Sequence, residues 1–309
     1  MRFTAKVKTL AISGVAAASV LGMATAANAQ DGDILIGEGA FPESIAALPN
    51  GGFITGSVVS PNLYAWAPGD ESASVWATTD GVTLGVFATE DTVYACVGDP
   101  GFSGNGRLVT FDLASAEQSG VYPLPSAGLC NDIAVSPDGT AFVTDTGGFA
   151  GMPGAVFALV PVDEEGNLGL QTVVASSAIG GADGLAFLGD RLIVNDVMTG
   201  ALFAIDLDGA TMTDFEFLDV SRALEGPDGM RTAVDGSGIY VAENAAGRVS
   251  FITIDGDSAT VETVGEGDWM SATSVAEFND GIYVIDTMFG MMGGDEVPTF
   301  YAHRVEGGM

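Results

Sequence analysis

The hydrophobic and polar positions of the chain repeat in six segments. Each segment holds a short apolar strand, a tight turn that is often Asp-Gly, and a second strand that ends in an acidic or small polar residue. Two more strands follow each pair, as in ALFAIDLDG and MTDFEFL after Met198. The second residue of each segment is apolar and recurs about every 45 positions, at Ile45, Val86, Ile133, Leu185, Met230 and Val275.

Four strands repeated six times, without helical periodicity, predict an all-β fold, a six-bladed β-propeller with four-stranded blades. Residues 30–309 would form it. A two-sheet sandwich is the alternative, but it would not be expected to repeat so regularly. We expect the N-terminal strand to close the last blade, with Asp33-Ile34-Leu35-Ile36 as its outer strand beside Phe300-Tyr301-Ala302-His303.

The first residues have the pattern of a secretory signal peptide. Arg2, Lys6 and Lys8 precede an apolar run over residues 10–21, and Ala27-Asn28-Ala29 follows. A membrane anchor would need about 20 apolar residues, and this run is shorter. The sequence therefore predicts cleavage after Ala29, so that residues 1–29 are the signal peptide and the protein is periplasmic or secreted.

The charge of the chain excludes some partners. It has 41 Asp and Glu against 9 Lys and Arg, a formal net charge of −32, and would repel nucleic acid or an anionic bilayer. We therefore expect no nucleic-acid partner and no membrane span. Beyond Ala29 there is no Lys, which excludes Schiff-base and P-loop chemistry. The oligomeric state is left open.

The two cysteines leave two interpretations open. An oxidising compartment permits a disulfide between Cys96 and Cys130. Alternatively, both are small buried apolar residues.

Candidate chemistry lies just before the first strand of each repeat, because these positions converge around the central channel of a propeller. Four of the six positions carry oxygen donors of the kind that Ca²⁺ or another divalent cation requires. Asp183 and Asp228 precede Gly and could be turn residues only, but Glu43 and Asn131 do not precede Gly. The six positions are Glu43, Leu84, Asn131, Asp183, Asp228 and Thr273.

The segments FPESIAALPNGG, CNDIAVSPDGTAFVTD, ADGLAF and GPDGMRTAVDGSGIYVAEN resemble the gluconolactonase and regucalcin (senescence marker protein) family, and more distantly diisopropyl fluorophosphatase and the paraoxonases. The resemblance covers essentially the whole chain after the signal peptide. It implies a calcium or other divalent ion held at the channel by Glu43, Asn131, Asp183 and Asp228. The family usually has Asn where this chain has Asp183, which leaves open whether Asp183 binds the ion, shares a proton or acts as the base.

A cation at this position could polarise an ester, lactone or phosphoryl oxygen while a carboxylate activates water or attacks. We expect Asp228 to be the catalytic base or nucleophile, with Asp183 as the second candidate. Serine-triad chemistry is excluded, because no G-x-S-x-G occurs and the single histidine, His303, is expected to be solvated or packed in the last strand.

The substrate pocket is expected to be apolar. The loops over residues 98–106, 147–154 and 288–298 contain Phe102, Phe149, Met152, Phe289, Met291 and Met292. These side chains either line an adaptable pocket or cover blade edges. Asp145, Asp196, Glu243 and Asp286 end the second strands and are expected to add negative charge on the same face. Arg222 is the one cation placed to meet an anion there, so a neutral, partly apolar lactone or ester fits best.

The leading hypothesis is an exported, metal-dependent lactonase or esterase. Its rival is a non-catalytic propeller that binds a ligand or protein across the same face, because a propeller by itself fixes no function. Phosphotriester hydrolysis would use the same residues.

Overall fold

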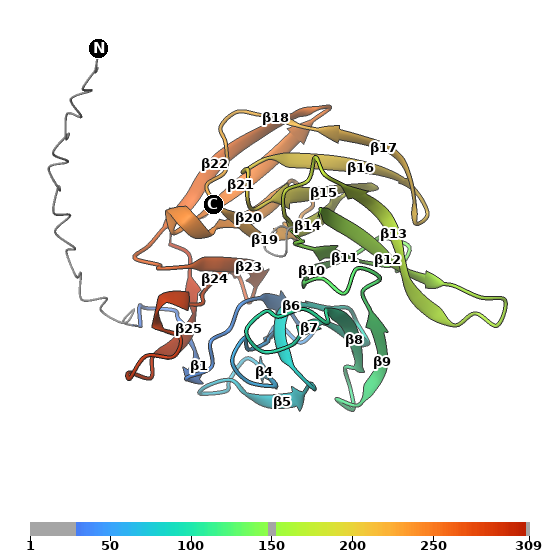
Figure 1. The fold of residues 1–309 in the computed structure, drawn as a ribbon. Coiled ribbons are helices and arrows are strands. Elements are labelled where there is room, and N and C mark those ends of the chain that lie inside the picture. The colour runs from blue at the N-terminus through green and yellow to red at the C-terminus, as the bar shows by residue number, and fades with distance from the viewer. Residues whose placement is uncertain (1–28, 148–152, 307–309) are drawn as a thin grey trace, which may run out of the picture.

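Six small antiparallel sheets surround a common centre in the computed structural model, which describes residues 29–147 and 153–306 (Figure 1). The predicted six-bladed β-propeller is therefore confirmed. The signal-peptide segment before Ala29 lies outside the described residues. The described stretches contain no α-helix, only the short 3₁₀ turns η2 (Asn244–Ala246) and η3 (Phe289–Met291). Neither turn has the length and hydrophobicity that a membrane crossing needs.

Each blade runs from an inner strand to an outer one. The inner strands are buried at nearly every residue, whereas the outer strands are more exposed. Blades 1 to 3 comprise β2 (Ile45–Ala47), β3 (Phe53–Thr55), β4 (Asn62–Trp66) and β5 (Ser74–Thr78); β6 (Val82–Ala88), β7 (Thr92–Gly98), β8 (Arg107–Asp112) and β9 (Gln118–Pro123); and β10 (Cys130–Val135), β11 (Ala141–Asp145), β12 (Gly154–Pro161) and β13 (Leu168–Ser176). Blades 4 to 6 comprise β14 (Ala182–Leu188), β15 (Arg191–Asp196), β16 (Leu202–Asp208) and β17 (Thr211–Phe217); β19 (Pro227–Thr232), β20 (Ile239–Glu243), β21 (Arg248–Asp255) and β22 (Ser258–Glu266); and β23 (Ala272–Phe278), β24 (Gly281–Asp286), β25 (Thr299–Arg304) and β1 (Ile34–Glu38).

Blade 5 departs from the repeat. A two-residue strand, β18 (Asp219–Val220), pairs in parallel with the outer edge of β22. In the other blades the fourth strand is the edge of the sheet. In blade 5, β18 pairs with part of that edge, and a paired edge is less able to bind a strand of another molecule.

The ring closes as the sequence predicts. Ile34 of β1 pairs with Ala302 of β25, in the last blade. Asp33 secures this closure, because it accepts hydrogen bonds of 2.8 Å from the His303 ring and 2.9 Å from the backbone N–H of Arg304. His303 is buried, so it belongs to the closure and not to solvent.

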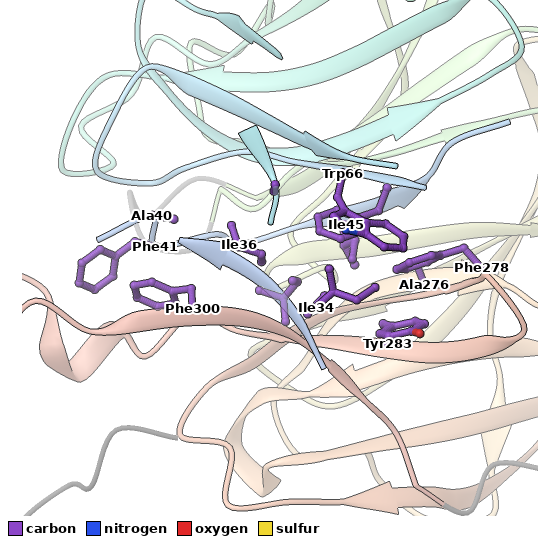
Figure 2. Close-up of a cluster of buried hydrophobic side chains, with 14 of the residues drawn as sticks. Ile34, Ile36, Ala40, Phe41, Ile45, Trp66, Ala276, Phe278, Tyr283 and Phe300 are labelled. Atoms are coloured by element: carbon purple, nitrogen blue, oxygen red, sulfur yellow. The ribbon is translucent and has the colours of Figure 1, made fainter. Parts of the chain in front are cut away.

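The core lies between adjacent blades, where the apolar faces of neighbouring sheets pack. Figure 2 shows the cluster between the last blade and the first, in which the rings of Phe41 and Phe300 lie next to each other, with centroids 4.7 Å apart and planes inclined by 52°. Phe278 stacks on Tyr283 in the same cluster. Burial of each large apolar side chain contributes about 1.5–3 kcal/mol, so this packing holds the seam between the two ends of the chain.

The cysteines form a disulfide. Cys96 of β7 and Cys130 of β10 are bonded and completely buried, with their Cα atoms 5.0 Å apart. The bond joins blades 2 and 3 and ends next to Asn131.

Candidate functional site

The six ring positions fall at irregularities of the inner strands. In five blades the strand register shifts around the position two before the apolar marker residue, as it does between Cys130 and Ile133 around Asn131. The same shift surrounds Leu84, Asp183, Asp228 and Thr273. Glu43 has the corresponding place in the first blade, two positions before β2 begins. A β-bulge bends the strand and changes the direction of the side chain at the bulge. This explains why the residues two positions before the apolar markers are the ones at the channel.

The glycines that follow two of these residues are not turn glycines. Gly184 and Gly229 lie inside β14 and β19. A Cβ at Gly184 would overlap the backbone oxygen of Asp228 in the next blade. The glycines therefore allow the inner strands of neighbouring blades to approach closely. The interpretation of Asp183 and Asp228 as turn residues is wrong.

One cavity of about 570 Å³ contains all four oxygen-donor residues. Each of the four is buried. Two amides hold the carboxylates: Asn131 donates to Oδ2 of Asp183 at 2.8 Å, and Asn244 donates to Oδ2 of Asp228 at 3.0 Å. The lining residues are Glu43, Leu84, Gly101, Phe102, Leu129, Asn131, Asp183, Val197, Asp228, Asn244, Phe289 and Met292.

Neighbouring blades fix the backbone of the donor residues. The hydroxyl of Thr144, on β11, donates to the backbone oxygen of Asp183 at 2.6 Å. The side chain of Asn195, on β15, donates to the backbone oxygen of Asp228 at 2.6 Å. Asp183 and Asp228 are therefore each held by the blade before their own.

The three carboxylates are difficult to ionise together. Burial, followed by the nearby charges of Asp228 and Asp132, raises the pKa of Glu43 well above its usual value. Burial and the charges of Asp228 and Glu43 do the same to the pKa of Asp183. Burial also raises the pKa of Asp228, to about 7, although the hydrogen bond from Asn244 opposes it. A bound cation would favour the ionised forms of all three.

The donor types fit a hard divalent cation. Oδ1 of Asp183 is buried and has no hydrogen-bond partner among the described residues, and the amide oxygen of Asn131 is left available because its hydrogen bonds to Asp183 and Thr146 use the nitrogen. Carboxylate and amide oxygens are the ligands that Ca²⁺ takes. Within residues 29–147 and 153–306, however, no group of three or more His, Cys, Asp or Glu side chains is already arranged to hold a metal ion.

Arg222 does not face the cavity, which corrects the expectation that it meets an anion there. Its guanidinium donates to both carboxylate oxygens of Glu243, at 3.0 and 2.6 Å. Glu243 is completely buried and draws the guanidinium away from the donor residues. Within the described stretches no Arg or His lines the cavity, so its lining offers no cationic side chain to an anionic substrate.

The acidic residues that end the second strands also have another role than expected. Asp145 accepts from the backbone N–H groups of Leu129 and Gly147, at 2.9 and 3.0 Å. Asp196, Glu243 and Asp286 likewise accept from backbone N–H groups of the loop before their blade's inner strand. These buried carboxylates satisfy loop donors and do not line the cavity.

The residues expected to line the substrate pocket fall into two groups, those in the cavity lining and those outside it. Leu84, Phe102, Phe289 and Met292 line the cavity. Met291 is not part of the lining; it packs against the core cluster between the last and first blades, as Phe289 and Met292 also do. Thr273 is buried and its hydroxyl is 2.7 Å from that of Thr287, away from the cavity lining. Phe149 and Met152 lie outside the described residues.

Sequence reasoning missed two groups. Asn244 lines the cavity and directly follows the acidic end of β20, so the residue after each second strand was the available signal. Asp132 and Arg231 form a buried ion pair, with Nη1 of Arg231 2.9 Å from Oδ2 of Asp132. In the repeats, Arg231 occupies the position that Ala or Phe takes elsewhere: Ala46, Phe87, Ala134, Ala186 and Ala276.

Comparison with solved structures shows similar propellers. The chain is similar to the Mala s 1 allergen of Malassezia sympodialis (TM-score 0.68, 15% identity, covering 89% of this chain and 95% of that one). It is also similar to a calcium-binding protein, regucalcin, from Agrobacterium tumefaciens (0.62, 16%, 90% and 92%), and to a gluconolactonase from Xanthomonas campestris (0.60, 16%, 84% and 84%). At these identities the likeness concerns the fold.

No curated protein sequence matches the chain. A family profile described as the SMP-30/Gluconolactonase/LRE-like region matches residues 52–276, which is more than half of the chain and spans the donor positions Asn131, Asp183 and Asp228. The chain therefore belongs to the SMP-30/gluconolactonase/LRE-like family.

Proposed function

We propose that this protein is an exported, divalent-cation-dependent hydrolase of a neutral, partly apolar lactone or ester. One observation carries the proposal: a single cavity brings three buried carboxylates and two amides together with the side chains of Phe102, Phe289 and Met292. Membership of a family that includes gluconolactonases supports a lactone over other substrates.

Glu43, Asn131, Asp183 and Asp228 would hold the cation, with Ca²⁺ as the first candidate. A regucalcin neighbour described as calcium-binding supports this choice. When bound, such an ion polarises a carbonyl oxygen and stabilises the negative charge that develops on it.

Asp228 is the proposed base or nucleophile. Asn244 donates to its Oδ2 and the backbone N–H of Gly229 donates to its Oδ1, at 3.0 Å each, so the carboxylate is oriented by two fixed donors. It would take a proton from the attacking water or attack the carbonyl carbon itself. Asp183, held by Asn131, is the second candidate for this role.

The lining of the cavity favours a neutral substrate. Five apolar side chains from four blades line it, namely Leu84, Leu129, Val197, Phe289 and Met292, and Phe102 adds a further ring. A substrate carboxylate would meet Glu43, Asp183 and Asp228 without a compensating cationic side chain. A sugar acid lactone with a free carboxylate is therefore a poor fit.

Export remains part of the proposal. Residues 1–29 have the order of a signal peptide, and the Cys96–Cys130 disulfide is typical of oxidising compartments. N-terminal sequencing of the protein recovered outside the cytoplasm tests this. A mature chain starting at Gln30 is expected, and an N-terminus at or near Met1 would contradict it.

The activity is tested by a panel of lactones, aryl esters and phosphotriesters, assayed with and without a chelator. We expect the highest kcat/KM for neutral lactones or esters with apolar substituents, and loss of the rate on chelation. Preference for phosphotriesters would assign the same residues to phosphoryl chemistry. If the panel shows no turnover while a ligand still binds the cavity, the protein is the non-catalytic binding propeller.

A further inference from the structure

A buried ion pair lies among the inner strands, next to the donor residues. Nη1 of Arg231 is 3.0 and 2.9 Å from the two carboxylate oxygens of Asp132. Nη2 of Arg231 donates to Oγ of Ser44 at 3.1 Å and to the backbone oxygen of Val86 at 2.7 Å. Arg231 and Asp132 are both buried, and their partners come from blades 1, 2, 3 and 5.

Each proposed cation ligand lies one or two positions before a residue that belongs to this pair or contacts it. Ser44 follows Glu43, and Asp132 follows Asn131. Oδ2 of Asp132 also lies within 3.4 Å of the backbone N–H groups of Leu185 and Met230. These two residues stand two positions after Asp183 and Asp228 respectively, so the pair reaches the backbone beside every donor.

A buried ion pair of this kind is weak evidence for stability, because desolvation of the two charges offsets most of their attraction. Its better-supported use is to specify one arrangement of the surrounding chain. The planar guanidinium suits that use, since its N–H groups point in fixed directions. Here those directions lead to Ser44, Val86 and Asp132, on three different blades.

We propose that Arg231 and Asp132 are positioning residues that hold the four donors in register before a cation binds. The inference rests on the proposed cation site, but not on the proposed reaction. It predicts that loss of the pair weakens cation affinity while the propeller still folds. Partners that orient metal ligands commonly change affinity by about 10- to 100-fold when they are lost.

The charge of Arg231 must be separated from its geometry. Arg231→Lys keeps the positive charge but cannot reach Asp132, Ser44 and Val86 with one fixed fork. The double variant Asp132→Asn with Arg231→Met removes both charges and leaves the net charge unchanged. If only electrostatics mattered, neither variant would lose cation affinity.

The test is calorimetric titration of the chelator-treated protein with Ca²⁺ alone. We expect Kd to rise about 10- to 100-fold in both variants, with a cooperative thermal transition retained. Asp33→Asn is the matched control: it breaks another buried carboxylate contact, that with His303, and should lower the thermal midpoint without changing Kd.

Three results would overturn the inference. The first is a Kd for Ca²⁺ in Arg231→Lys within about twofold of the wild-type value. The second is an equal loss of affinity in Asp33→Asn, which would show that any destabilisation of the propeller weakens binding. If the double variant does not fold, Arg231→Lys alone decides. Failure of the wild-type protein to bind Ca²⁺, Mg²⁺, Mn²⁺ or Zn²⁺ removes the cation site itself, whereas binding without lactone hydrolysis removes only the proposed reaction.

Discussion

The side-chain amide of Asn131 donates a hydrogen bond of 2.8 Å to Oδ2 of Asp183, and so joins blades 3 and 4 at the centre of the ring. The resemblance to the gluconolactonase and regucalcin family implies an Asn at the position of Asp183. The amide donor explains how a buried carboxylate is accommodated there, since it satisfies one oxygen and leaves Oδ1 without a partner among the described residues.

Asp183→Asn should weaken Ca²⁺ binding on the order of tenfold, because ligand charge is one of the factors that set calcium affinity. The substituted amide can still accept from Asn131 through its oxygen, so the fold should persist. Calorimetric titration checks the affinity and circular dichroism checks the fold. Equal or tighter binding in the variant would show that the negative charge of Asp183 does not contribute to calcium affinity.

Asp228→Asn should reduce kcat by about 10²-fold or more, because general acid–base catalysis contributes about 10²–10⁴-fold. Initial rates on the best lactone of the panel measure the effect. Asp235→Asn is a suitable control, since Asp235 is exposed on the turn between β19 and β20. A rate close to wild type in Asp228→Asn would transfer the role of base to Asp183.

Phe102 and Phe289 belong to loops of blades 2 and 6 and make an edge-to-face pair, with ring centroids 6.4 Å apart. Phe289→Ala should lower kcat/KM for lactones with long alkyl substituents by roughly tenfold, because about 1–3 kcal/mol of apolar contact is lost. Short, polar lactones should change little. A uniform loss across the panel would mean that Phe289 supports the loop and not the substrate.

The buried carboxylate of Glu243 makes the free energy of unfolding depend on pH. Burial alone would raise its pKa, but hydrogen bonds from Arg222, Arg248 and Ser250 lower it to about 2 from 4.5. The stabilisation is therefore complete above about pH 4.5 and is lost as the pH falls toward 2. The shift corresponds to roughly 3 kcal/mol. Urea unfolding of wild type and Glu243→Gln should differ at pH 6 and converge near pH 2; a constant difference would contradict this.

The Cys96–Cys130 disulfide should stabilise the protein by about 4 kcal/mol, as expected for a sequence separation of 34. Both cysteines are completely buried, so their replacement by Ala leaves no polar group unpaired. Denaturant unfolding of the double variant Cys96→Ala with Cys130→Ala measures the loss. An unchanged free energy of unfolding would show that packing alone joins blades 2 and 3.

The sequence was sufficient to predict the propeller and the strand β1 that closes it. Strand patterns are local, and their repetition every ~45 residues fixes the number of blades. The same repetition located Asn131, Asp183 and Asp228, because each bulge falls at the same offset from an apolar marker.

Interactions between blades were not predictable in this way. Arg222 and Arg231 look alike in sequence, but Glu243 binds the first and Asp132 binds the second. Which carboxylate each meets depends on how separate blades pack. The signal that could have found Arg231 is its place in the repeats, a charged residue at a position that is otherwise Ala or Phe.

One titration tests the central claim most directly: Ca²⁺ added stepwise to chelator-treated protein while hydrolysis of a neutral, apolar lactone is followed. The rate should be near background without the ion and should rise in step with bound Ca²⁺ until about one ion per chain is bound. Asn131→Ala should need a much higher Ca²⁺ concentration for the same rate. Full activity in the presence of chelator, with no Ca²⁺ bound, would contradict the account.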